Sequence, residues 1–173
     1  MGRAYTKQVD VVISSWQTGP ELLLSTKTMS SSFGKNLANR FEEAYGDAGN
    51  LQARYPLASI GFAFVVSSTI LDEPSQAEKA IDMLYKLRDR GDGNGYMATT
   101  LIGYHAVEGP RVRILTDAFP EDLGPAQFME TMIDAILEAS PVTDHQHVRE
   151  SRRGYVVIPN EPEGGPEPSA PAP

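Results

Sequence analysis

The residues from Leu57 to Leu71, LASIGFAFVVSSTIL, form an apolar stretch with almost no interruption. A strand with one solvated face would alternate between apolar and polar residues, and this stretch does not. Its continuity is typical of a strand that is covered on both faces, as in the centre of an α/β sheet. It is also shorter than the roughly 20 apolar residues that cross a bilayer. The stretch therefore predicts a layered fold built around one buried strand.

The segments around this strand predict the element order ββαβαββα. The first helix is indicated by apolar residues at i+4 spacing, with the serines at 30–32 as N-caps and Gly46 as its stop. A capping box, Ser75-x-x-Glu78, predicts the start of the second helix. Together these signals predict an α/β fold, a mixed central sheet flanked by helices. The predicted strands are 9–14, 21–29, 57–71, 96–107 and 111–119, and the predicted helices are 33–45, 75–90 and 124–139.

Length and composition favour one domain followed by a polar tail. A chain of 173 residues fits a single domain, which we expect to span residues 1–158, with a short edge strand at 156–158. Residues 159–173 are rich in Pro, Gly and Glu, which predicts a disordered tail. The chain has no cysteine, so disulfides, thiolate metal ligands and a cysteine nucleophile are excluded. With neither a signal-peptide pattern nor a membrane-spanning run, we expect a soluble, cytoplasmic protein.

The net charge of −8 is unevenly distributed along the chain. Residues 1–60 carry six Lys and Arg against five Asp and Glu, a net charge of +1. Residues 61–173 carry nine against eighteen, a net charge of −9. An acidic protein is a poor binder of nucleic acid by charge alone. Because the first third is close to neutral, this objection does not apply to a site built there.

The first predicted hairpin carries the residues with most chemical potential. If its turn is centred near Thr18, Asp10 lies opposite Lys27 and Val12 lies opposite Ser25. A shift of one residue in the turn would break this pairing. Asp10 beside Lys27 has two interpretations. One is a cross-strand salt bridge worth under about 1 kcal/mol. The other is half of a Mg²⁺-dependent hydrolytic site, in which Asp holds the cation and Lys orients water or stabilises phosphate charge.

These residues resemble the signature of the PD-(D/E)XK nuclease superfamily, which includes most restriction endonucleases. That signature is an Asp at the start of one strand and acid-x-Lys at the end of its neighbour, and here the two parts are Val9-Asp10 and Ser25-Thr26-Lys27. Ser25 stands where the second acid is expected. One branch of restriction endonucleases also has Ser-x-Lys, with a Glu on the following helix supplying the acid. The resemblance covers Val9 to about Ile70 and implies a restriction-endonuclease-like core.

The helix that follows Lys27 carries two candidates for the missing acid, Glu42 and Glu43. Both lie roughly 130° from the centre of the apolar face, on opposite sides. We favour Glu43, because Asn36 and Arg40 share its flank and would bind phosphate. The resemblance then implies Asp10 and Glu43 as Mg²⁺ ligands, Lys27 as the residue that positions water and Ser25 as a residue that holds a water. The candidate DNA contacts are Lys35, Asn36, Arg40 and Arg54.

Two functions of this fold remain open at this point, beside a third alternative, an unrelated α/β binding domain. The first is metal-dependent cleavage of DNA with Mg²⁺ or Mn²⁺, by a homodimer or by the nuclease domain of a larger defence protein. The second is a catalytically inactive module of the same fold that binds DNA or protein in a larger assembly. Only nine residues precede Asp10, whereas the family core has a helix and a strand there. The pair His145 and His147 and the arginines after it predict an exposed loop rather than a metal site.

Overall fold

A five-stranded mixed sheet forms the centre of the first of two compact units, residues 1–140. The computed structural model describes residues 2–88, 93–107, 111–115, 117–141 and 143–154. Strands β2, β3 and β4 are parallel, and β1 and β5 are antiparallel edge strands. The predicted α/β class is therefore confirmed. The strands lie in the order β1 (Val11–Ser15), β2 (Gly19–Met29), β3 (Ser59–Ser67), β4 (Ala98–Val107) and β5 (Arg111–Leu115).

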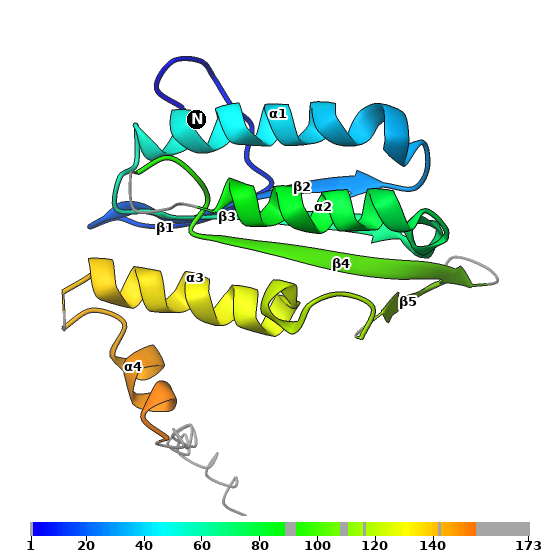
Figure 1. Cartoon of the computed structure of the whole chain (residues 1–173). Helices are drawn as coiled ribbons and strands as arrows, with labels where there is room; N and C mark the ends of the chain where they lie inside the picture. Colours follow the sequence, from blue (N-terminus) through cyan, green and yellow to red (C-terminus); the bar gives the residue numbers. More distant parts are fainter. Residues whose placement is uncertain (1, 89–92, 108–110, 116, 142, 155–173) are drawn as a thin grey trace, which may run out of the picture. The chain divides into compact units, whose positions relative to one another are not determined.

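Helices cover both faces of this sheet (Figure 1). Helix α1 (Phe33–Gln52) connects β2 to β3, α2 (Pro74–Leu87) connects β3 to β4, and both lie on one face. Parallel crossovers share one handedness, and these two advance in the same direction across the sheet, so their helices fall on the same side. Helix α3 (Pro125–Ala139) covers the other face. Two short 3₁₀ helices, η1 (Ser68–Asp72) and η2 (Glu121–Leu123), precede α2 and α3.

Strand β3 is the buried central strand that the apolar stretch predicts. Its residues from Ser59 to Phe64 are all buried, between β2 on one side and β4 on the other. The strand is shorter than the stretch. Leu57 is exposed before it, and after Ser67 the chain turns into η1, where the Ser67 hydroxyl accepts a hydrogen bond from Thr69 N. The apolar residues of the stretch thus serve two elements rather than one.

Helix α1 continues through Gly46, so the predicted stop at this residue is wrong. Gly46 does not have the positive φ of a helix-terminating glycine, and the helix ends at Gln52. A glycine inside a helix costs about 1 kcal/mol relative to alanine. Burial of Ala48 and Leu51 on the following turns offsets this cost. The predicted caps are also wrong, since the Ser32 side chain makes no capping hydrogen bond and Ser75 lies inside α2, which begins at Pro74.

We expect Gly46→Ala to raise the free energy of unfolding by about 0.5–1 kcal/mol, because alanine favours the helix and meets no obstacle. A Cβ at this position would lie 3.7 Å from Tyr5 Oη, an ordinary contact. The same substitution at Gly61 is the control. There the Cβ would lie 2.6 Å from Phe128 Cζ, so stability should fall by about 1–3 kcal/mol. Urea denaturation measures both, and a loss of stability in Gly46→Ala would contradict the helical assignment.

The second compact unit, residues 141–173, contains one short helix among its described residues, α4 (Gln146–Arg152). The prediction of a loop around His145 and His147 is wrong in this respect. Arg149 ties the segment together by donating to the carbonyl oxygens of Asp144 at 2.9 Å and Pro141 at 3.2 Å. The predicted edge strand 156–158 and tail 159–173 lie outside the described residues. No helix in the described ranges is long and apolar enough to span a membrane.

Candidate active site

The β1–β2 hairpin has a different register from the one that the sequence predicts. Val12 pairs with Leu23 rather than with Ser25, and Val11 pairs with Leu24. The turn lies one residue earlier than predicted, because Ser15 lies opposite Gly19. The strand register also shifts between Ile13 and Ser14, just before this turn. The pairing of Asp10 with Lys27 is therefore wrong, and Asp10 adjoins Ser25 and Thr26 instead.

Asp10 directly precedes Val11, the first residue of β1, and is attached there to the edge of β2. Its backbone N–H donates to Leu24 O at 3.2 Å, and its Oδ2 accepts a hydrogen bond from Thr26 N at 2.6 Å. The carboxylate thus accepts a hydrogen bond from the N–H of Thr26, which lies beyond the part of β2 that pairs with β1. The Asp10 side chain is exposed, and its Oδ1 has no hydrogen bond to any described residue. One oxygen of Asp10 is fixed and the other is available to a ligand.

Ser25 and Lys27 point from β2 toward helix α1. Alternate residues of a strand share a face, and Leu23 and Met29 on the same face belong to the core beneath α1 and α2. Ser25 is 3% exposed, and its Oγ has no hydrogen-bond partner among the described residues. A buried hydroxyl without a partner marks a place for a water, an ion or a ligand atom.

Lys27 and Glu43 are brought together across the gap between β2 and α1. Lys27 Nζ lies 3.7 Å from Glu43 Oε2, and Arg40 Nη1 lies 3.5 Å from the same oxygen. Glu43 is half exposed and Lys27 is about one quarter exposed, so the group opens to solvent. Glu43 Oε1 has no hydrogen bond or ion pair with a described residue. Like Asp10, Glu43 keeps one oxygen available.

Glu42 points into a different environment from its neighbour. It lines an apolar groove of about 440 Å³ between α1 and α2. The other lining residues are Phe41, Tyr45, Met83, Lys86 and Leu87. Neither Lys27 nor Asp10 lines this groove. Of the two helix glutamates, the structure brings Glu43 to Lys27.

The predicted DNA contacts are spread along α1. Arg40 lies beside Glu43, and Asn36 is one turn earlier on the same flank. Lys35 is exposed on the first turn of the helix. Arg54 lies beyond the other end of α1, roughly 15 Å along the axis from Glu43, where it donates to Gly2 O and Tyr55 Oη. Arg40 and Asn36 are thus the ones nearest to Lys27 and Glu43.

The donor set fits Mg²⁺, although it is small. Mg²⁺ usually keeps several waters and is held by one or two carboxylates. The free oxygens of Asp10 and Glu43 and the unpartnered Ser25 hydroxyl are ligands of this kind. Within the described ranges, no group of three or more His, Asp and Glu side chains is arranged around one metal position. The carboxylates would provide two ligands, and water would complete the shell.

Three buried polar residues hold α1 in place and were not identified from the sequence. Asp47 is 5% exposed and Asn50 is 7% exposed, on the face of the helix that also buries Ala48 and Leu51. Tyr96 lies beneath the helix, donates to Ala44 O at 3.0 Å and is fully buried. Burial raises the pKa of the Tyr96 hydroxyl above its ordinary value. Asp47 belongs to the helical series 44, 47, 48, 51, and Asn50 follows Asp47 at i+3, a spacing that could have shown both had the helix not been ended at Gly46.

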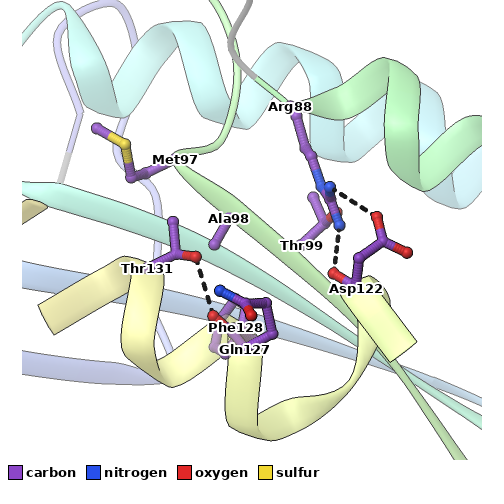
Figure 2. Close-up of a pocket in the computed structure, with 8 residues that line it drawn as sticks. All are labelled: Arg88, Met97, Ala98, Thr99, Asp122, Gln127, Phe128 and Thr131. Carbon is purple, nitrogen blue, oxygen red and sulfur yellow. Dashed lines mark hydrogen bonds and ion pairs between the residues drawn. The ribbon is translucent and has the colours of Figure 1, made fainter. Parts of the chain in front are cut away.

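A pocket of about 280 Å³ lies elsewhere, over the first residues of β4 (Figure 2). Arg88 closes one side of it by donating to Thr99 Oγ1 at 3.0 Å and Asp122 O at 2.8 Å, and it pairs with the Asp122 carboxylate. Tyr85 donates to Asp122 Oδ1, and this hydrogen bond raises the pKa of the tyrosine. These polar groups satisfy one another. The pocket shares no residue with the candidate site.

Neither a known protein family, nor a curated protein, nor a solved structure matches this chain.

Proposed function

We propose that this chain hydrolyses phosphodiester bonds in DNA with Mg²⁺, or with Mn²⁺ in its place. The observation that carries the proposal is that two acids from distant parts of the chain contact consecutive residues of β2. Asp10 contacts Thr26, and Glu43 contacts Lys27. Ser25, whose buried hydroxyl has no hydrogen-bond partner among the described residues, directly precedes Thr26 and Lys27 on β2. The resemblance of these positions to the PD-(D/E)XK nucleases, in the Ser-x-Lys form, supports the same chemistry.

Asp10 and Glu43 would hold the cation through the oxygens that they leave free. When bound, Mg²⁺ stabilises negative charge on the phosphate and lowers the pKa of a coordinated water. The protein's contribution is to keep the two carboxylates in place before the metal arrives. Thr26 N fixes Asp10, and Arg40 together with Lys27 fixes Glu43.

Lys27 would orient the attacking water and stabilise the charge that develops on the phosphate. Its ammonium group is a compact donor with three hydrogens, so it can contact Glu43 and a water or phosphate oxygen together. The water attacks phosphorus and releases a proton to solvent, the bond from phosphorus to the leaving sugar oxygen breaks, and that oxygen takes up a proton from solvent, so that the protons balance. Ser25 would accept or donate a hydrogen bond to a water at the site, which would satisfy its buried hydroxyl.

DNA would lie across the N-terminal half of α1. Arg40 and Asn36 flank Glu43 there, and Lys35 extends the polar surface toward the start of the helix. The protein as a whole is acidic, so these few contacts predict weak binding that depends on salt. We propose that a second copy or a larger assembly supplies further DNA contacts, and that the protein acts in the cytoplasm.

A catalytically inactive DNA-binding or protein-binding module is the second candidate. The observation that favours it is that both positive neighbours of Glu43, Lys27 and Arg40, already neutralise this carboxylate. Such a cluster also suits a structural role on a protein surface. The two candidates differ in whether Asp10 is needed for a reaction.

Plasmid cleavage tests the proposal. We expect the full chain to nick or linearise DNA with Mg²⁺ or Mn²⁺ and to lose this activity in EDTA. Asp10→Asn keeps an oxygen for Thr26 N but loses the charge, so cleavage should fall at least 10²-fold. The control is Asp82→Asn, an exposed acid on α2 that is paired with Lys86. Metal-dependent cleavage that Asp10→Asn leaves unchanged would contradict the site. A wild type that binds DNA without cutting it would favour the module.

A further inference from the structure

The first residues of the chain lie along helix α1 as a strap, which we define as residues 2–9 (Figure 1). Asn50 holds the backbone of this strap from a buried position. Its Oδ1 accepts from Ala4 N at 2.7 Å and Tyr5 N at 3.4 Å, and its Nδ2 donates to Tyr5 O at 3.1 Å. One side chain thus satisfies three backbone groups. Such a complete set of bonds fixes both the position and the direction of the strap.

Asp47 holds the strap one turn earlier on the same helix. Its Oδ1 accepts a hydrogen bond from Tyr5 Oη at 2.9 Å, and its other oxygen pairs with Lys7 Nζ. The carboxylate is almost fully buried, and a buried charge is stable only when it is paired and hydrogen-bonded. The buried face of α1 therefore carries an acid, Asp47, whose hydrogen bond and ion pair with described residues are both made to the strap.

Asp47 and Asn50 are linked to both proposed metal ligands, to Asp10 through the strap and to Glu43 through α1 itself. Along the chain, Lys7 lies three residues before Asp10, and Val9 between them packs against the core. Along α1, Asp47 lies one turn after Glu43. Asp10 and Glu43 are therefore both attached to the same few turns of α1, one through the strap and the other directly.

We propose that Asp47 and Asn50 are positioning residues that set the separation of Asp10 from Glu43 and thereby the affinity for the divalent cation. This inference rests on the proposed function, since it concerns the same metal site. Residues that orient metal ligands without touching the metal commonly change affinity by 10–100-fold when they are replaced. A strap that served only stability would leave this affinity unchanged.

The experiment compares three variants of the full chain with the wild type. Asn50→Leu removes all three backbone bonds, and Asp47→Asn keeps an acceptor for Tyr5 but loses the charge opposite Lys7. Thr100→Val is the matched control, because it removes a buried hydrogen bond of 2.7 Å to Leu123 O on the α3 side of the sheet. Mn²⁺ binding is measured by calorimetry without DNA, and trypsin cleavage after Lys7 is followed by mass spectrometry.

We expect Asn50→Leu to be cleaved faster after Lys7 and to bind Mn²⁺ at least tenfold more weakly than the wild type. Asp47→Asn should change both quantities less, and Thr100→Val should change neither, even if its melting temperature falls as far. A released strap with unchanged Mn²⁺ affinity would overturn the inference and leave the proposed function standing, and so would an affinity loss of equal size in Thr100→Val. A wild type that binds no Mn²⁺ would overturn the metal site and the inference together.

Discussion

Lys27→Ala should lower the rate of Mg²⁺-dependent DNA cleavage by about 10³-fold, the largest effect that we expect from one substitution. The reason is that no other described cation contacts Glu43 from the strand side, where Asp10 is attached. The free energy of unfolding should change by less than about 1 kcal/mol, because a partly exposed ion pair contributes little to stability. Single-turnover cleavage and thermal denaturation measure the two effects separately.

The control for this substitution is Lys86→Ala. Lys86 also pairs with an acid, Asp82, but on the surface of α2. Its replacement should leave cleavage within about twofold of wild type, as for other exposed residues away from a site. Lys27→Arg is informative as well, because a planar guanidinium does not reproduce the position of a compact ammonium group, and activity should stay low. Full activity in Lys27→Ala would rule out the proposed mechanism.

Glu43→Gln should lower cleavage by about 10²-fold, whereas Glu42→Gln should leave it nearly unchanged. The two residues are adjacent on α1, yet Glu43 contacts Lys27 and Glu42 lines the groove between α1 and α2. Glutamine keeps the shape of the side chain and removes the charge that a cation needs. Raising the Mg²⁺ concentration should restore part of the activity of Glu43→Gln, which steady-state cleavage at several Mg²⁺ concentrations would detect. The opposite ranking of the two variants would reassign the ligand to Glu42.

The layered fold was predictable because burial on both faces leaves a direct mark on sequence. The apolar stretch at 57–71 contains β3. Of the predicted i+4 series on α1, Phe33, Leu37 and Phe41 are buried, whereas Tyr45 is exposed. The end of α1 was missed because glycine inside a helix and glycine after a helix look alike in one sequence. What distinguishes them is the tertiary packing of Ala48 and Leu51, which the local pattern does not carry.

The candidate site was predictable in its residue types more than in its geometry. Asp10 and Lys27 were singled out by the predicted hairpin and Glu43 by the family resemblance, but the pairing of Asp10 depended on a turn whose position shifted by one residue. The irregularity between Ile13 and Ser14 leaves no clear signal in the sequence. Asp47 and Asn50 were overlooked because a polar residue near a predicted helix end is usually solvated, and their partners are forty or more positions away.

The strands of the sheet lie side by side in the same order in which they occur in the chain. No strand has to wait for a distant segment before it can pair, and contacts that are close in sequence favour rapid folding. Chains emerge from the ribosome with the N-terminus first. By the end of β3, at Ser67, the elements that carry Asp10, Ser25, Lys27 and Glu43 have all been synthesised. The scaffold of the candidate site is therefore able to form during translation, before the acidic part of the chain has been made.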